Sequence, residues 1–258
     1  MIPIKTSEEI EIMRQAGKYL AQIMREIARQ VKPGISTFEL DELAEKLIRQ
    51  IGAESAFKGY LPDTVQPNHR SGYPATLCTS INNEVVHGIP NKNRFLKNGD
   101  IVGIDCGLKL KGYFSDMAIT LAVGKVGPAA KKLLNVTKKA LDLAIKKIKP
   151  GIHLGDVSFT IQNYVEKNNF SVVRELSGHG VGQKLHEEPT ILNFGKPSTG
   201  PILKEGMVLA IEPMVNTGTW QIKTLPDGWT IVTADGSLSA HFEHTIVVTK
   251  NGAKILTK

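Results

Sequence analysis

The sequence predicts an α+β fold in which two pseudo-symmetric halves form one curved antiparallel sheet covered by helices. The clearest evidence is an internal repeat, because residues 96–105 match residues 203–212. Both copies contain a turn, then an apolar strand, then a carboxylate at the far end of that strand. The tetrapeptide Lys-Pro-Gly-Ile also occurs twice, starting at Lys32 and at Lys149, and follows a helical pattern each time. Each half is therefore predicted to contain a helix pair followed by strands.

The first helix is predicted from Thr6 to about Val31. Thr6 with Glu9, or Ser7 alone, caps its N-terminus, and apolar residues then recur at helical spacing. A Pro-Gly pair at 33–34 ends the helix, because proline cannot continue the hydrogen-bond pattern.

A second helix begins at a capping box formed by Ser36 and Glu39 and stops near Gly52. The segment 57–72 then combines two prolines with two glycines. We expect it to be a long loop within the domain and not a linker between domains.

The second half repeats this order of elements. Pro128 stands at the first position of a helix that continues to about Ile148, where proline costs no hydrogen bond. Another Pro-Gly pair ends that helix, and a further helix is predicted from near Gly155 to Lys167.

The two halves are expected to belong to one domain. A chain of 258 residues can bury a sizeable core, and its length allows one or two domains. The halves join near Gly124 without a low-complexity stretch. We predict a single catalytic domain, residues 1–258, with an internal pseudo-repeat of about 1–124 and 125–258.

The chain is basic, with 32 Lys+Arg against 25 Asp+Glu and a net charge of +7. A basic surface can attract RNA or a ribosome. The blander alternative is that the lysines of one helix only solvate its outer face, and the absence of nucleic-acid motifs favours it. These residues are Lys131, Lys132, Lys138, Lys139, Lys146 and Lys147.

Composition and targeting signals predict a cytoplasmic protein. The hydrophobic fraction is 41%, and no apolar run approaches the ~18 residues that a membrane span needs. The N-terminus lacks a secretory hydrophobic region and carries acids too early for a transit peptide. Only Cys78 and Cys106 are present, which is no disulfide framework and suits a reducing compartment.

Residues 101–109 and 113–122 are predicted to form a hairpin with a turn between them. This pairing places Asp105 and Asp116 roughly opposite one another. Like charges across an antiparallel pair repel, and a divalent cation between them reverses the sign of that interaction.

Glu212 and Glu243 occupy the repeated positions in the second half. Acids in apolar strands are unfavourable unless they are paired or bind a cation. Four carboxylates placed by an internal repeat therefore indicate a metal centre.

The histidines fall into two groups. His179 and His186 lie seven residues apart in a glycine-rich stretch that lets backbones approach closely. One neutral imidazole with four carboxylates is an oxygen-rich set, which suits Mn, Fe(II) or Co better than a structural zinc. His87 has glycine and proline beside it and is predicted in a loop over the site. The HExxH, GxSxG, Walker and GxGxxG motifs are absent from the sequence.

In order and spacing, these motifs resemble the type I methionine aminopeptidases, over essentially Lys5 to Leu256. The resemblance implies a pita-bread fold and removal of the initiator methionine from nascent proteins when the second residue is small and uncharged. The matching segments are Glu-Val-Val-His-Gly-Ile-Pro at 84–90, Asp105, Asp116, Gly-His-Gly-Val-Gly at 178–182, His-Glu-Glu-Pro at 186–189, Ile-Glu-Pro-Met at 211–214 and Glu-His-Thr at 243–245.

The resemblance also implies two divalent ions, which could be Co, Mn, Fe(II) or Zn. Asp105, Asp116 and Glu243 would bridge or flank both ions, while His179 and Glu212 would complete the coordination of the first. Such ions lower the pKa of bound water. Glu212 would take the proton of that water and later pass it to the leaving amine.

His87 and His186 would remain unligated and hold the substrate's amide and carbonyl, with His186 stabilising the oxyanion. The methionine side chain needs an apolar, polarizable pocket. Tyr73, Cys78 and Trp229, together with both histidines, match the family's pocket lining. The implied partner is the N-terminal methionine of nascent peptides, with room for transient ribosome contact through the basic surface. No membrane association is expected, and a monomer is predicted.

Two departures and two rival functions stay open at this level. Leu185 stands where many family members carry an aromatic residue, and Ser71-Gly72-Tyr73 replaces a His-Gly-aromatic pattern of some relatives. Aminopeptidase P and prolidase share the metal-ligand set but typically add an N-terminal domain. A catalytically inactive relative would bind RNA or ribosomes through the basic face, although such proteins lose metal ligands.

Overall fold

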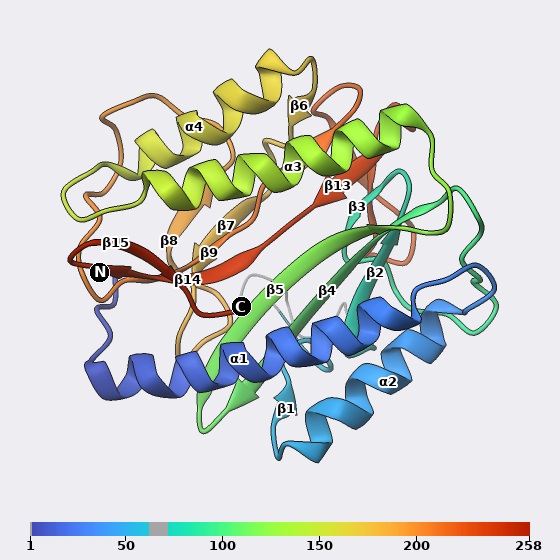
Figure 1. Ribbon diagram of the computed structural model, residues 1–258, viewed down its shortest axis with the longest axis horizontal. Coiled ribbons are helices and arrows are strands. Elements are labelled where there is room, and N and C mark those ends of the chain that lie inside the picture. The colour runs from blue at the N-terminus through green and yellow to red at the C-terminus, as the bar shows by residue number, and fades with distance from the viewer. Residues whose placement is uncertain (1, 62–71) are drawn as a thin grey trace.

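The computed structural model describes residues 2–61 and 72–258, and a helix pair opens each half of the chain (Figure 1). Most of the predicted loop at 57–72 lies outside the described residues. The helices are α1 (Ser7–Gln30), α2 (Thr37–Gln50), α3 (Pro128–Lys147) and α4 (Leu154–Lys167).

The four predicted helices are confirmed, and the predicted caps form them. The Thr6 hydroxyl accepts from the Glu9 N–H while the Glu9 carboxylate accepts from the Thr6 N–H, and Ser36 with Glu39 repeats this capping box on α2. Pro128 is the first residue of α3. Each helix buries one apolar stripe against the strands and exposes a polar face.

The strands form four antiparallel ladders. The first-half ladder contains β1 (Glu54–Ser55), β2 (Leu77–Ile81), β4 (Ile101–Leu110) and β5 (Tyr113–Ala122), and the largest second-half ladder contains β7 (Ser177–Gly180), β8 (Glu187–Leu192), β9 (Val208–Ile211), β14 (His244–Thr249) and β15 (Gly252–Ile255). The two smaller ladders are β6 (Ser171–Val172), β10 (Met214–Asn216) and β13 (Ser239–His241), and β3 (Glu84–Val86), β11 (Ile222–Thr224) and β12 (Ile231–Thr233).

The two large ladders meet along β5 and β14, which lie side by side in the middle of the molecule (Figure 1). The Glu243 N–H donates to the Ala118 carbonyl oxygen over 2.8 Å. The Thr245 hydroxyl accepts from the Asp116 N–H at 3.0 Å and donates to the Asp116 carbonyl oxygen at 2.8 Å. The predicted α+β class is thus confirmed. The predicted single sheet is instead a layer of separate ladders, and these few hydrogen bonds join the two large ones.

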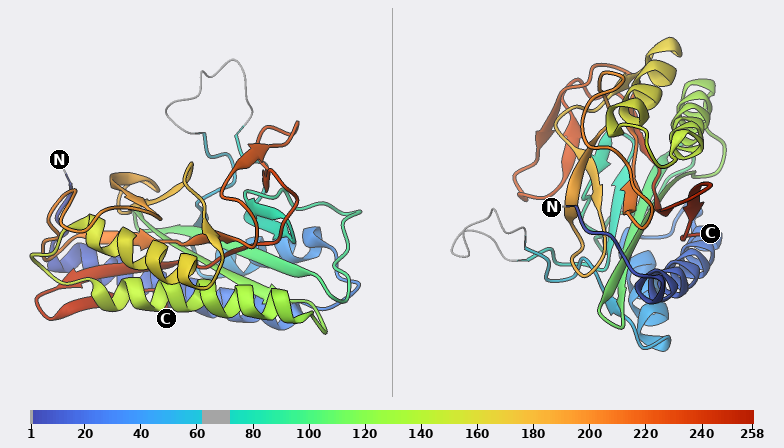
Figure 2. Two further views of the ribbon diagram at one scale, coloured as in Figure 1. Left: turned by 90° about the horizontal axis from the view of Figure 1, so that it is seen from above. Right: turned by 90° about the vertical axis from the view of Figure 1, so that its left-hand side faces the viewer.

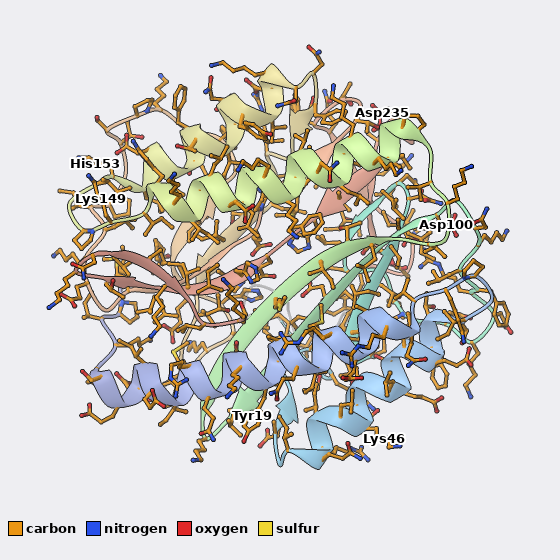
Figure 3. All side chains as sticks on the ribbon, viewed as in Figure 1. Tyr19, Lys46, Asp100, Lys149, His153 and Asp235 are labelled. Atoms are coloured by element: carbon orange, nitrogen blue, oxygen red, sulfur yellow. The ribbon has the colours of Figure 1, made fainter. Side chains whose placement is uncertain are left out.

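The helices lie on one side of this strand layer and the loops on the other (Figure 2). One apolar core fills the space beneath α1 and α2, and a second fills the space beneath α3 and α4. Charged side chains such as Lys46 and Lys149 lie at the periphery (Figure 3). Within 2–61 and 72–258, none of the helices combines the length and apolar character that crossing a membrane requires.

Candidate active site

A cavity of about 990 Å³ gathers side chains from both halves of the chain. Every residue that the sequence predicted to bind metal or substrate lines it. These residues are Tyr73, Cys78, His87, Asp105, Asp116, His179, His186, Glu212, Trp229 and Glu243.

Strand alternation aims Asp105 at the cavity. Ile104 and Cys106, on either side of it in β4, belong to the apolar core beneath α1 and α2. Because successive side chains of a strand point to opposite faces, Asp105 faces away from that core. The side chains at even-numbered positions of β4 therefore pack beneath the helices, whereas Asp105 lines the cavity.

The hairpin of β4 and β5 places two acids on one face, roughly opposite each other as the sequence suggested. Asp105 pairs with Ala118, and Asp116 pairs with Gly107. The two carboxylates are therefore diagonal neighbours, still within reach of a shared ion.

The second half delivers its two acids to the same place. Glu243 precedes β14 and donates its N–H to Ala118, the residue that faces Asp105 across the hairpin. Glu212 directly follows β9, whose Ile211 pairs with His244 of β14. The strand pairings thus bring both glutamates beside the aspartates.

Asp116 and Glu243 are buried and Asp105 and Glu212 are partly buried, and the four carboxylates together have too few hydrogen-bond partners. Burial raises the pKa of Asp116 to about 7, and burial with repulsion from neighbouring acids raises the pKa values of Asp105 and Glu243. Burial likewise raises the pKa of Glu212. The Asp105 Oδ1 and Glu243 Oε1 atoms are enclosed and accept no hydrogen bond from the part of the chain described. Buried acceptors of this kind fit a cation, which would satisfy them all.

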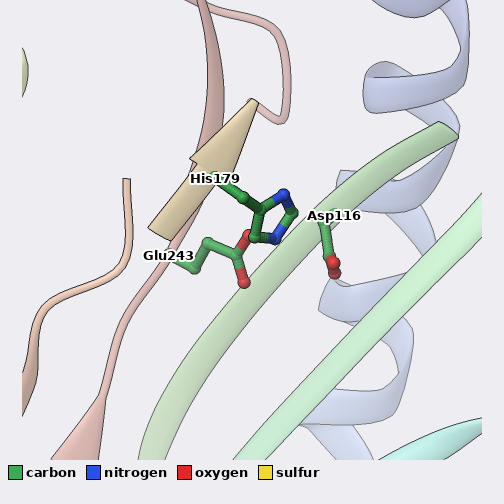
Figure 4. A group of neighbouring side chains, drawn as sticks. All are labelled: Asp116, His179 and Glu243. Carbon is green, nitrogen blue, oxygen red and sulfur yellow. The ribbon is translucent and has the colours of Figure 1, made fainter. Parts of the chain in front are cut away.

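His179 completes a set of ligand atoms with Asp116 and Glu243 (Figure 4). One ligand atom from each residue lies within 4.8 Å of the other two. The His179 Nδ1 lies 2.9 Å from the Gly180 carbonyl oxygen, to which it can donate, and this leaves Nε2 as the ligand atom.

The glycine-rich stretch around His179 allows its strand to approach β9 closely, as predicted. A Cβ built on Gly178 would lie 2.5 Å from the Ala210 carbonyl oxygen and 3.3 Å from Glu212 Cγ. A side chain at this position would therefore push β7 away from Glu212.

Two residues of the site were missed by the sequence analysis. His241 forms a second possible ligand group with Glu212 and Glu243, again within 4.8 Å. The sequence did contain a signal for His241. Residues two apart in an extended segment share a face, and Glu243 was already predicted to be a metal ligand. Tyr60 contacts His186, with its hydroxyl oxygen 2.5 Å from Nδ1. A tyrosine in a loop region carries no comparable signal.

His87 and His186 have lowered pKa values and are therefore neutral at neutral pH. Burial, with repulsion from His241 and His186, lowers the pKa of His87 to about 4, and burial lowers the pKa of His186. The His186 ring packs edge-on against His179 with centroids 4.3 Å apart. His87 directly follows β3 in the predicted loop, with a φ of 59°.

An apolar pocket adjoins the acids. Tyr73, Cys78 and Leu185 are buried in one cluster against which Trp229 packs, with the Tyr73 and Trp229 rings 5.3 Å apart. Leu185, predicted at the pocket edge, is 4% exposed and lines the cavity. Ser71, the other departure from the family pattern, lies outside the described residues.

Comparison with known proteins gives the same family throughout. Residues 11–250 match the model of metallopeptidase family M24. The chain is 51% identical to methionine aminopeptidase 1 of Bacillus subtilis over 258 residues, which is 100% of both chains. It is 46% identical to the methionine aminopeptidase of Escherichia coli, covering 99% of this chain and 94% of that protein.

Solved structures agree with these relatives and confirm the pita-bread fold. The crystal structure of a methionine aminopeptidase from Thermotoga maritima superposes with a TM-score of 0.95 at 48% identity, covering 100% of both chains. A prolidase from Pyrococcus horikoshii gives a TM-score of 0.75 at 26% identity and is covered over only 63% of its length. The chain belongs to the methionine aminopeptidases of metallopeptidase family M24.

Proposed function

We propose that this chain is a metal-dependent aminopeptidase that removes the initiator methionine from nascent proteins when the second residue is small and uncharged. The observation that carries the proposal is the buried group of four carboxylates and His179 beside an apolar pocket. Enclosed carboxylate oxygens without partners among the described residues fit cations. The relatives named methionine aminopeptidase support the substrate.

The proposed cofactor is a pair of divalent ions, either Co, Mn, Fe(II) or Zn. Asp105, Asp116 and Glu243 would hold the pair together with His179 and Glu212. When bound, such ions supply Lewis acidity and lower the pKa of water.

Glu212 is proposed as the general base, because it lines the cavity and its carboxylate lies within 3.5 Å of His179 and 3.4 Å of His241. Its carboxylate would take a proton from the attacking water and deliver it to the leaving amine. The same residue would also provide a ligand oxygen, and this second role would fix the position of the base.

His87 and His186 are proposed to hold the substrate. As neutral imidazoles, each can donate one N–H, so His186 would donate to the carbonyl oxygen of the scissile bond and His87 to the peptide. The Tyr60 hydroxyl beside His186 Nδ1 would orient that ring.

The methionine side chain would occupy the pocket of Tyr73, Cys78, Trp229, His87 and His186. A role of Cys78 as a nucleophile is disfavoured, since burial and the nearby Asp105 charge raise the pKa of its thiol well above the usual value. We propose that Cys78 is a small apolar wall of the pocket.

The proposal extends to the whole protein. Residues 1–258 would act as one catalytic domain, monomeric and cytoplasmic, in keeping with the buried, unpaired Cys78 and Cys106. The six predicted lysines of α3 are all exposed. They offer a surface for transient ribosome contact, with plain solvation of the helix as the alternative.

A peptide panel tests the proposed function. Metal-loaded protein is expected to release methionine from Met-Ala-Ser and to leave Met-Lys and Ala-Pro peptides intact, with free amino acids measured by chromatography. Cleavage of Ala-Pro would instead indicate an aminopeptidase P or prolidase activity. Failure to cleave any peptide, with metal bound, would favour a non-catalytic relative.

Leu185→Phe tests the pocket. Leu185 is buried against Tyr73 and Cys78, so a phenyl ring should reduce the space for bulky side chains. Pocket changes of this size shift discrimination by ~1–3 kcal/mol. The ratio of kcat/KM for methionine over ethionine peptides is expected to rise, with metal content unchanged. Leu192→Phe is a matched control at an exposed leucine, and equal ratios in all three proteins would show that Leu185 does not border the substrate.

A further inference from the structure

His241 has a buried nitrogen that the proposed chemistry does not yet use. The residue ends β13 and is 4% exposed. Its Nε2 is enclosed and has no hydrogen-bond partner in the described parts of the chain. The nearest carboxylate oxygen that it faces is Glu212 Oε2, at 3.4 Å. An enclosed ring nitrogen beside a proposed catalytic carboxylate calls for a functional explanation.

Two hydrogen bonds hold the backbone of His241 in place. The His241 N–H donates to the Thr120 hydroxyl oxygen at 2.9 Å, and that hydroxyl donates to the His241 carbonyl oxygen at 2.7 Å. His241 also pairs with Met214 across β13 and β10, and Met214 follows Glu212 by two residues. The distance from ring to carboxylate is therefore set by strand register and by the junction of the two halves.

Glu212 stands between two imidazoles. Its Oε1 lies 3.5 Å from His179 Nε2, the nitrogen proposed to bind the first ion. Its Oε2 lies 3.4 Å from His241 Nε2 on the other side. One oxygen thus faces His179 and the other faces His241.

We propose that His241 is a positioning residue that donates its Nε2–H to Glu212 Oε2 and so fixes the orientation of this carboxylate as ligand and base. The inference rests on the proposed function of Glu212. A neutral ring carries its hydrogen on either nitrogen. With the lone pair on Nε2, two acceptors would face each other at 3.4 Å, whereas hydrogen there makes the approach attractive. Partners that orient ligands in this way are a common feature of metal sites.

The competing role is a direct ligand. Glu212, His241 and Glu243 could together surround an ion, since their ligand atoms lie within 4.8 Å of one another. A glutamine side chain separates the two roles. Its amide N–H₂ reaches about as far as His Nε2 and donates a hydrogen bond, but glutamine can bind a metal only through its carbonyl oxygen. Replacing an imidazole nitrogen ligand with that oxygen would change the Co(II) spectrum, whereas replacing a donor to Glu212 would not.

The experiment compares His241→Gln and His241→Ala with the unsubstituted protein, and uses His244→Gln as a control for loss of a partly buried imidazole. His244 lies three residues away on β14, where its Nδ1 contacts the Thr257 hydroxyl at 2.9 Å, and it does not line the cavity. Each protein is freed of metal and titrated with Co(II). The visible spectrum, the number of ions bound and the thermal midpoint are recorded before turnover of Met-Ala-Ser is measured.

His241→Ala is expected to keep its Co(II) band positions but to lose about 10–100-fold in kcat, with little change in KM, because the base is no longer oriented. His241→Gln is expected to recover kcat to within about threefold, because it restores the donor. The His244→Gln control should match the unsubstituted protein in spectrum and kcat.

Three results would overturn the inference. Altered Co(II) spectra in both His241 variants, with an ion lost, would make His241 a direct ligand. A kcat in His241→Gln as low as in His241→Ala, with normal spectra, would rule out a donor role. A normal kcat in His241→Ala would rule out any role of His241 in turnover. If the unsubstituted protein binds Co(II) but cleaves no peptide, the proposed function fails, and that result is separate from these comparisons.

Discussion

Replacing Glu212 with Gln is expected to lower kcat by about 10²-fold or more, the usual scale for removal of a general base. The substitution keeps the shape of the side chain but removes its proton acceptor and one negative charge. Glu212 lines the cavity, and its two carboxylate oxygens face His179 and His241. The loss should appear in kcat measured with saturating Met-Ala-Ser at full metal loading.

Metal content decides how this result is interpreted, because Glu212 is also a proposed ligand. Glu205→Gln is a matched control, since Glu205 is an exposed acid in the turn before β9. Turnover near that of the unsubstituted protein, with normal metal content, would exclude Glu212 as the base.

Removing the ions is expected to destabilise the protein as well as inactivate it. A ligand present at 1,000 times its Kd stabilises the folded state by about 4 kcal/mol. For a chain of this size, such a loss corresponds to a fall in Tm of roughly 10 °C. Differential scanning calorimetry before and after chelation, with metal analysis and re-addition of metal, measures it. An unchanged Tm in protein that has lost its ions would contradict a shared carboxylate site.

The pH dependence of the stability of metal-free protein also tests the shared carboxylate site, and the direction of the change can be predicted. Burial raises the pKa of Asp116 from its ordinary 3.8 to about 7, so the folded state holds a proton that the unfolded state has released. Stability from this group is complete below pH 3.8 and is lost as the pH rises through about 7. The Asp105, Glu212 and Glu243 pKa values are also raised and act in the same direction.

The histidines act in the opposite direction but only at lower pH. Burial lowers the pKa of His87 to about 4 and that of His179 to about 3, from an ordinary 6.5. Their contribution rises with pH until it is complete above 6.5. Between about pH 6.5 and 8 the carboxylates therefore dominate, and the Tm of metal-free protein should fall. Metal-loaded protein should show no such fall, because its ligands are already ionised.

The sequence predicted the parts of this protein that follow local rules. Thr6 with Glu9 and Ser36 with Glu39 set the helix starts because capping is decided within four residues. The repeat located all four acids because strand ends position them in the same way in each half. The family resemblance then identified the histidines and the pocket residues, and these line one cavity.

Features that depend on pairing between distant strands were not predictable in the same way. The diagonal placement of Asp105 and Asp116 depends on where the hairpin turns. The separation of the strand layer into ladders depends on the junction between Ala118 and Glu243. His241 reaches Glu212 only through the register of β13 with β10, which one sequence does not determine.

Bound divalent metal in this carboxylate and histidine group is expected to drive removal of N-terminal methionine. Methionine release from Met-Ala-Ser is measured while Mn(II) or Co(II) is titrated into metal-free protein, with bound metal determined in parallel. No release is expected without metal, and the rate should rise with bound metal until the site is filled. Full activity in protein shown to be free of metal, or no activity with the site saturated, would contradict this expectation.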